Sequence, residues 1–260
     1  METFKYISSA DNPQFKYLKK LATAPRERRK SGQTVLDGLH LLHALADAGQ
    51  TPALLVVREG SQQVEEISAV LHRFHLVVGL VLSSGLFDAI APVETPTGVL
   101  AVFDIPKPGT TAFTSAVLLE NIQDPGNLGS IIRTAAAAGC EAIFLSKGCA
   151  EAWSPKTLRA GMGAHFVIPV YEQQDLPTVA KQFANVYATS LSATKSIYEI
   201  ALQVPTAFVF GNEGAGLSAE LLSCASQRIN IPMSGKVESL NVAAAVAVCL
   251  FERWRQINYG

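Results

Sequence analysis

The sequence contains few of the features that mark membrane, secreted or metal-binding proteins. No apolar run follows a basic start and none is long enough to cross a bilayer, so we expect no signal peptide and no membrane partner. The four cysteines are scattered without CxxC spacing, which is typical of reduced core thiols in a cytoplasmic protein. The histidine pairs His40/His43 and His72/His75 lack a third ligand, so we predict no metal site.

The dinucleotide-binding fingerprint G-x-G-x-x-G is also missing, as is an acidic residue placed after a first strand to hold a ribose. Both absences argue against a Rossmann-type oxidoreductase. The composition is that of a well-packed protein, because hydrophobic residues make up 48% of the 260 residues and charged residues 17%. This length allows one large domain or two small ones.

Charge is distributed unevenly along the chain. The first 30 residues carry eight basic and three acidic side chains, a balance of +5, so the other 230 residues sum to −6. A basic end on an acidic body is a pattern of nucleic-acid-binding proteins, although a solvated terminal segment gives the same pattern. The candidate contacts to nucleic acid are Lys16, Lys19, Lys20, Arg26, Arg28 and Arg29.

The first hundred residues indicate a small α/β unit. Residues 1–30 read as a helical arm, because Phe15, Leu18 and Leu21 recur at a spacing of three. Hydrophobic patterning then predicts strands at 34–36, 53–57, 76–78 and 98–103, and helices at 39–48, 65–72 and 85–91. Residues 104–111, rich in proline and glycine, form the best linker candidate.

The rest of the chain has a regular α/β pattern. Short, continuous apolar runs predict strands at 116–119, 142–145, 166–170, 186–189, 207–210 and 229–231, with room for helices between most of them. Such strands predict a parallel sheet covered on both faces. Ligands bind such sheets at the carboxyl ends of the strands, where three polar or glycine-rich stretches lie here.

The first stretch runs from residue 120 to 133. Pro125-Gly126 predicts a turn, and Asn127 is placed to cap the next helix. Arg133 lies outside the apolar face of that helix. Its side chain can bind an anion there or simply remain solvated.

The second stretch, FGNEGAGL at 210–217, has three glycines in six residues, which allow a backbone to come close to a ligand. Glu213 within it would repel phosphate and suits a cationic or hydroxyl-bearing ligand better. A tight turn with one exposed acid is the alternative.

The third stretch is 228–254. A strand at 229–232 leads into a flexible loop, and Ser239 is a good N-cap for the helix that follows. Residues 242–250 contain no charge, so we expect this helix to be covered on every face by the domain body, a second subunit, or both. Backbone groups of 231–233 and 239–241 are placed to line a purine-sized pocket.

Together the segments NLGSIIR, FGNEG and IPMSGKVESLN resemble the three motifs of the SpoU (TrmH-like) class of RNA ribose 2′-O-methyltransferases, in the SPOUT superfamily. The segments SSADNPQFKYLKKL, VLDGLHLL and TPTGVLAV are similar to the L30e-like substrate-binding domain often fused to these enzymes. Asp37 stands where glutamate is commoner. The resemblance implies an L30e-like RNA-binding domain at 1–103, a linker at 104–111 and a SpoU methyltransferase domain at 112–260.

The resemblance also implies a carboxyl-terminal trefoil knot, S-adenosylmethionine as cofactor, and a homodimer that completes the site. The implied catalytic residues are Asn127, Arg133, Glu213, Ser239 and Asn241. The implied cofactor-binding residues are Gly211, Asn212, Gly214, Ile231, Pro232, Met233, Ser239, Leu240 and Asn241. Arg133 is expected nearest the 2′-oxygen, either as a base or as a clamp on phosphate and developing alkoxide.

The function implied is methyl transfer to a ribose 2′-hydroxyl of RNA bound by the basic segment. Ribosomal RNA is preferred to transfer RNA because of the L30e-like domain, an argument by analogy. The alternative from another class is a catalytically silent RNA-binding paralogue that assists ribosome assembly. Intact Arg133, Glu213 and Asn241 argue against it.

Overall fold

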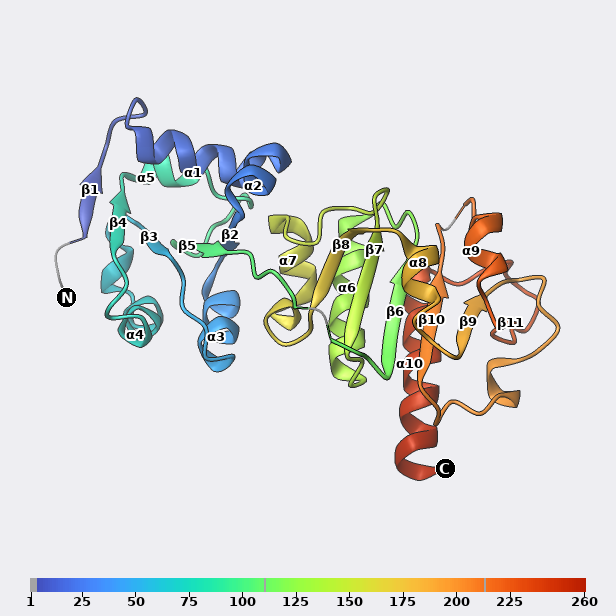
Figure 1. The fold of residues 1–260 in the computed structure, drawn as a ribbon. Coiled ribbons are helices and arrows are strands. Elements are labelled where there is room, and N and C mark those ends of the chain that lie inside the picture. Colours follow the sequence, from blue (N-terminus) through green and yellow to red (C-terminus); the bar gives the residue numbers. More distant parts are fainter. Residues whose placement is uncertain (1–3, 110, 213) are drawn as a thin grey trace. The chain divides into compact units, whose positions relative to one another are not determined.

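The computed structural model describes residues 4–109, 111–212 and 214–260, which form two compact units (Figure 1). The first unit comprises the described residues up to Lys107 together with Trp153–Phe166, and the second comprises Pro108–Ala152 and Val167–Gly260. The change of unit at Lys107–Pro108 falls inside the expected linker, whereas the grouping of Trp153–Phe166 with the first unit has no counterpart in the sequence pattern. The domain bounds 1–103 and 112–260 remain a proposal.

The first unit is built on a mixed five-stranded sheet. Neighbouring strands β1, β4 and β3 run parallel, and β5 runs antiparallel to both β3 and β2. The order across the sheet is β1 (Lys5–Ile7), β4 (Gly79–Leu82), β3 (Leu54–Arg58), β5 (Val99–Asp104) and β2 (Gln33–Asp37).

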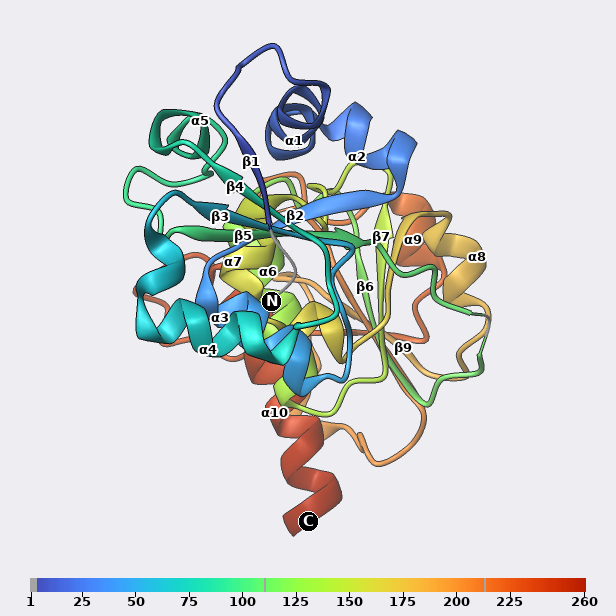
Figure 2. The same cartoon turned by 90° about the vertical axis from the view of Figure 1, so that its left-hand side faces the viewer.

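Helices cover both faces of this sheet. Phe15, Leu18 and Leu21 of α1 and Phe87 of α5 pack on one face in a single apolar cluster. Figure 2 shows α3 and α4 on the opposite side. The helical elements of this unit are α1 (Pro13–Thr23), α2 (Pro25–Ser31), α3 (Leu39–Asp47), the 3₁₀ turn η1 (Ser61–Gln63), α4 (Glu65–Arg73), α5 (Ser84–Asp88), α7 (Pro155–Gly161) and η2 (Ala164–Phe166).

Two expectations for this unit were wrong. Pro13–Thr23 and Pro25–Ser31 are helical as expected, but they do not form an arm, because α1 belongs to the core and Lys5–Ile7 before it pairs with β4. The strand expected at 76–78 begins at Gly79 instead. Leu76 is 88% exposed and Val78 67% exposed, so only the second half of that continuous apolar run enters the sheet. A run without alternation does not fix its own register.

The second unit has the expected parallel sheet, with six strands whose pairings are all parallel. The six predicted strands are all present, but two are displaced: β8 begins at Val170 rather than 166, and β11 ends at Ile229. The order is β11 (Gln227–Ile229), β9 (Val186–Thr189), β10 (Thr206–Phe210), β6 (Ser115–Leu119), β7 (Ala142–Ser146) and β8 (Val170–Gln174).

The two faces of this sheet carry different helices, because successive side chains of a strand point to opposite sides. Ala116 and Leu118 of β6 share a cluster with α8 and α9, which leaves the buried Val117 and Leu119 for the face of α6 and α10. Helices α6 and α10 also pack against one another. The helical elements are α6 (Pro125–Ala137), α8 (Leu176–Ala180), η3 (Ile197–Glu199), α9 (Ala219–Ser223) and α10 (Val242–Tyr259).

Within one chain, α10 is covered on only part of its surface. Val242, Val246, Cys249 and Leu250 are buried, whereas Ala244 is exposed. The body of the domain therefore does not cover this helix on every face, and cover by a second subunit stays a prediction. No helix among the described residues is long and apolar enough to cross a membrane.

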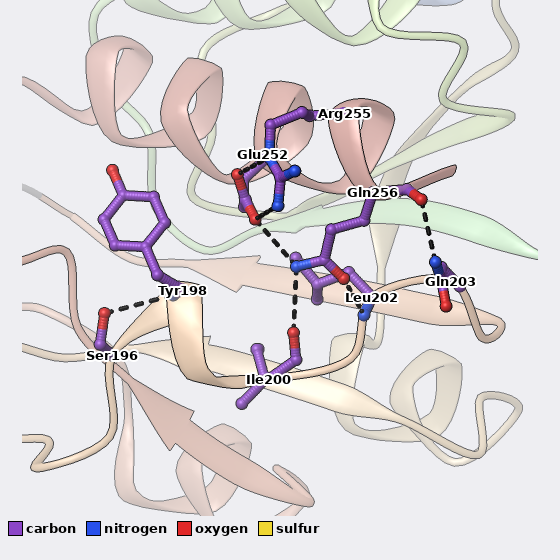
Figure 3. A network of polar contacts seen from close by, with 8 residues as sticks. All are labelled: Ser196, Tyr198, Ile200, Leu202, Gln203, Glu252, Arg255 and Gln256. Atoms are coloured by element: carbon purple, nitrogen blue, oxygen red, sulfur yellow. Dashed lines mark hydrogen bonds and ion pairs between the residues drawn. The ribbon is translucent and has the colours of Figure 1, made fainter. Parts of the chain in front are cut away.

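Polar contacts fix the last turns of α10 against the segment 197–203 (Figure 3). The Gln256 side chain donates to the Ile200 carbonyl oxygen at 3.1 Å and accepts from the Leu202 backbone N–H at 2.8 Å. It also donates to Glu252 at 2.9 Å, and Arg255 donates to both carboxylate oxygens of Glu252, each at 2.9 Å.

Candidate functional site

The second sheet has a point where the direction of chain winding reverses. From β6, the strands β7 and β8 continue to one side, whereas β10, β9 and β11 lie on the other. The carboxyl ends of β6 and β10 therefore meet at this point, with Leu119 paired to Phe210. In parallel sheets, such a switch point opens a crevice that receives ligands.

A cavity of about 390 Å³ lies beside this point, at the carboxyl ends of β9, β10 and β11. Its volume falls in the range of small-molecule sites. Leu191, Leu217, Leu240 and Val242 give it apolar walls. The remaining lining residues come from the strand ends, the loops that follow them, α9 and the start of α10: Thr189, Ser190, Ser192, Phe210, Gly211, Asn212, Gly214, Ala215, Gly216, Leu222, Ile229, Asn230, Ile231, Met233, Ser239 and Ala245.

The structure brings most of the predicted cofactor-binding residues to this one cavity. Those that line it are Gly211, Asn212, Gly214, Ile231, Met233, Ser239 and Leu240. Pro232 and Asn241 are not among the lining residues. Glu213, which was assigned to catalysis, lies outside the described residues.

The glycine-rich loop 211–217 is tightly closed on itself. A side chain at Gly211 would put its Cβ 2.3 Å from the Gly216 carbonyl oxygen, so only glycine fits there. The Asn212 Oδ1 accepts hydrogen bonds from the backbone N–H groups of Gly214 and Ala215, at 2.9 and 3.1 Å. Its Nδ2 donates to the Asn121 carbonyl oxygen at 3.0 Å, which ties the loop to the chain after β6.

Asn127 and Asn241 meet, although 114 residues separate them in the sequence. The Nδ2 of Asn241 donates to the Oδ1 of Asn127 at 3.0 Å, while its own Oδ1 accepts from the backbone N–H groups of Ala243 and Ala244. Asn241 is therefore the N-cap of α10, and the expectation that Ser239 caps this helix was wrong.

The cap of α6 also differs from the expectation. Asp124, not Asn127, is the N-cap, and its Oδ1 accepts from the Asn127 backbone N–H at 2.7 Å. Pro125 follows as the first helical residue, a position that suits proline because the N–H it lacks has no partner within the helix. The side chain of Asn127 does not cap the helix and instead accepts a hydrogen bond from Asn241.

Arg133 lies apart from the cavity in the single chain. It is exposed on α6 and does not line the cavity. It is six residues beyond Asn127, which is about 9 Å along a helix axis. Among the described residues, no carboxylate forms an ion pair with it.

Sequence reasoning missed the wall formed by Thr189, Ser190, Leu191 and Ser192. These residues directly follow a correctly predicted strand of a parallel sheet, so their position at a carboxyl end was the available signal.

The six basic residues proposed to contact RNA divide into two groups by their burial. Lys16, Lys19, Lys20, Arg26 and Arg29 are exposed on α1 and α2. Arg28, by contrast, is only 3% exposed, and its Nη1 donates to the Leu21 carbonyl oxygen at 2.6 Å. Its assignment to RNA binding does not fit this burial, so we remove it from the proposed RNA-facing set.

The cysteines are all free thiols. Burial raises the pKa of Cys140 to about 11 and that of Cys249 to about 12, so both are protonated at neutral pH. Burial also raises the pKa of Cys149. Among the described residues, no group of three or more histidine, cysteine or acidic side chains is arranged to hold a metal ion.

Comparison with known proteins gives consistent matches over both parts of the chain. Residues 114–251 match the SpoU rRNA Methylase family, and residues 12–101 match the MRM3-like substrate binding domain. The chain is 36% identical to an uncharacterized tRNA/rRNA methyltransferase of Synechocystis, over 96% of this chain and 93% of that protein. It is 35% identical to the 23S rRNA (guanosine(2553)-2′-O)-methyltransferase RlmP of Bacillus subtilis, over 95% of this chain and 98% of that protein.

A solved structure matches the chain along nearly its whole length. The AdoMet-bound rRNA methyltransferase from Sinorhizobium meliloti superposes with a TM-score of 0.84 at 29% identity, covering 99% of both chains.

Proposed function

Because this chain belongs to the SpoU rRNA methylase family, we propose that it transfers a methyl group from S-adenosylmethionine to a ribose 2′-hydroxyl of ribosomal RNA. The observation that carries the proposal is the cavity at the carboxyl ends of β9, β10 and β11, inside the matched region 114–251. Two of the three motif segments, FGNEG and IPMSGKVESLN, contribute walls to it.

The residues of the cavity suit S-adenosylmethionine. Apolar side chains such as Leu217 and Leu240 match a purine ring and methylene groups, and the glycine-rich loop presents backbone rather than side chains. We assign the cofactor contacts to Gly211, Ile231 and Leu240, mainly through their backbone groups. When bound, the cofactor supplies a methyl group activated by a sulfonium charge.

The chain itself must orient the ribose and stabilise the oxygen that loses its proton. Alignment of reacting groups lowers such a barrier by several kcal/mol. We assign to Arg133 the contact to the 2′-oxygen or its neighbouring phosphate, since a guanidinium holds its charge and forms paired hydrogen bonds to anions. The hydrogen bond between Asn127 and Asn241 holds the starts of α6 and α10 together next to the cavity.

We propose a homodimer in which a second copy completes the site. Arg133 lies outside the cavity of its own chain, which supports a shared site. The uncovered surface of α10 also carries large apolar side chains: Phe251 is 44% exposed, Trp254 37% and Ile257 48%. Light scattering at working concentration tests this state, and a monomer would contradict it. The trefoil knot and a location in the cytoplasm belong to the same proposal.

The decisive experiment combines cofactor binding with the mapping of RNA methylation. Calorimetry with S-adenosylmethionine tests the cavity directly, and an absence of both heat and thermal stabilisation would contradict the enzymatic proposal. Ribose methylation is then mapped in ribosomal and transfer RNA from a deletion strain and from the same strain with the chain restored. Sites that vanish and return in ribosomal RNA identify the substrate, whereas cofactor binding without any lost site favours a silent paralogue.

A further inference from the structure

Glu120 holds both ends of the glycine-rich loop. It directly follows β6, and its backbone N–H donates to the Phe210 carbonyl oxygen at 2.9 Å. Its carboxylate accepts two hydrogen bonds from Ser218, one from the backbone N–H and one from Oγ, each at 2.7 Å. Phe210 and Ser218 are the residues immediately before and after the loop 211–217. One residue, directly after a neighbouring strand, therefore closes the neck of this loop.

We propose that Glu120 is a positioning residue for the cofactor cavity, an inference that rests on the function proposed above. All described residues of the loop 211–217 line the cavity, so a shift of its neck changes the cavity wall. A carboxylate that accepts from two donors forms stronger bonds than a neutral acceptor. Ser218 is also the N-cap of α9, because its Oγ accepts from the Leu221 backbone N–H at 3.3 Å. Glu120 thus fixes the loop and the helix that follows it as one piece.

The contact from Asn212 to Asn121 strengthens this argument. Asn121 adopts φ +56°, a left-handed conformation that is uncommon outside glycine. Its backbone N–H donates to Ser146 Oγ at 3.0 Å. Consecutive residues, Glu120 and Asn121, therefore clamp the loop at its neck and in its interior. Neither residue lines the cavity, so both act on it through the loop alone.

The chain contains a natural control for the carboxylate clamp. Glu141, just before β7, accepts from the backbone N–H and the Oγ of Thr114, each at 2.6 Å. The same pairing of a carboxylate with one hydroxyl-bearing residue is present here. It lies at the amino ends of β6 and β7, whereas the cavity lies at the carboxyl ends of the strands. A change there disturbs an equivalent pair of hydrogen bonds without touching the loop.

The test compares Glu120→Ala with Glu141→Ala in the full chain, using S-adenosylhomocysteine as a non-reactive probe. Calorimetric titration should show a dissociation constant raised roughly tenfold for Glu120→Ala, since that is the scale of lost hydrogen bonds to a charged group. Glu141→Ala should bind like the wild type, even where thermal unfolding shows a comparable loss of stability. Glu120→Gln keeps the shape and one acceptor, so it should bind within about threefold of the wild type.

Amide hydrogen exchange without ligand gives a second readout. Residues 211–218 should exchange faster in Glu120→Ala and at the wild-type rate in Glu141→Ala. If Glu120→Ala does not fold, Ser218→Ala carries the test, because it removes the Oγ contact and leaves the backbone N–H bond; its loss of affinity should be smaller and of the same sign.

The outcomes separate the two proposals. Wild-type affinity in Glu120→Ala, or an equal loss in Glu141→Ala, overturns the positioning role while leaving the proposed function standing. A wild-type chain that binds neither S-adenosylhomocysteine nor S-adenosylmethionine overturns the proposed function, and unchanged exchange of residues 211–218 in Glu120→Ala overturns the clamp itself.

Discussion

Asn241 Nδ2 and Asn127 Oδ1 lie 3.0 Å apart, and this contact joins the N-terminus of α10 to the first turns of α6. Each asparagine comes from a different motif segment of the sequence. The same Asn241 side chain caps α10, so one residue both starts the helix and sets its position relative to α6. Ser239 and Leu240, which immediately precede it, line the cavity. The geometry of that wall therefore depends on Asn241, although Asn241 does not line the cavity itself.

Asn241→Ala should lower stability and weaken cofactor binding. Loss of an N-cap costs about 0.5–2 kcal/mol. Asn241→Ser separates the two roles, because serine retains a capping oxygen but lacks the amide Nδ2 that reaches Asn127. We expect thermal unfolding of Asn241→Ser to stay close to that of the wild type, with affinity for S-adenosylmethionine reduced as in Asn127→Ala. If Asn127→Ala bound the cofactor at full affinity, the contact between the two amides would serve stability alone.

The sequence predicted the parallel sheet of the second unit because its strands are short and apolar on both sides and alternate with stretches long enough for helices, a pattern typical of parallel sheets. It also predicted the glycine-rich wall, since three closely spaced glycines signal an unusual backbone. It failed where local chemistry was ambiguous. Asn127 and Ser239 are both good capping residues, but Pro125 fixes the start of α6 one residue after Asp124, and Asn241 lies closer to the apolar helix.

The contacts between loops were beyond prediction for a different reason. Glu120 and Ser218 are 98 residues apart, and Asn127 and Asn241 are 114 apart. No periodicity links such positions, because their proximity follows from the order of strands in the sheet. The burial of Arg28 had no signal either: within PRERRKS, every basic residue looks equally solvated until α2 folds back on the carbonyl groups of α1.

Reversal of the lysines on α1 should weaken RNA binding without affecting the cofactor. Lys16→Glu, Lys19→Glu and Lys20→Glu together should reduce affinity for RNA and flatten its dependence on salt. With fewer phosphate contacts, binding releases fewer counterions from the RNA. Lys16 contributes least, since it already pairs with Asp11 at 2.8 Å. Filter binding over a salt series measures the slope, and calorimetry with S-adenosylmethionine provides the control. Unchanged RNA affinity in the triple variant would make the segment an ordinary solvated surface.

Glu252 should make the protein sensitive to acid. Hydrogen bonds from Arg255, and then from Gln256, outweigh burial and hold the pKa of Glu252 below its ordinary value of 4.5. The unfolded chain therefore binds the proton more readily, so this stabilisation is present above pH 4.5 and is lost as pH falls through the lowered pKa. Its size is below about 1 kcal/mol, because more than half of the Arg255 side chain is exposed to water.

Urea unfolding on both sides of pH 4.5 should thus show a smaller acid-induced loss for Glu252→Gln than for the wild type. Arg255→Met removes the main cause of the shift and should reduce the loss in the same way. An identical pH dependence in all three proteins would assign the acid sensitivity to other carboxylates.

Arg133→Ala should abolish methyl transfer while the fold remains intact. The side chain is exposed on α6, and an exposed substitution of this kind changes stability by no more than about 0.5 kcal/mol. Cofactor affinity should stay near that of the wild type, since Arg133 does not line the cavity. Single-turnover methylation with RNA and cofactor both saturating isolates the chemical step, and a loss confined to KM would indicate RNA binding alone. Arg228→Ala, at another exposed arginine of the same unit, serves as the control.

Mixing two impaired variants then decides whether the site is shared between two copies. If Arg133 acts on the cavity of a second copy, dimers formed from Arg133→Ala and Asn241→Ala chains contain one intact site and one doubly altered site. Coexpression of the two variants, assayed at a cofactor concentration too low to saturate Asn241→Ala, should then give more methylation than either variant gives alone. Should the mixed protein gain nothing over the two variants assayed separately, Arg133 would have to reach the cavity of its own chain. An undiminished single-turnover rate in Arg133→Ala would remove it from the chemistry altogether.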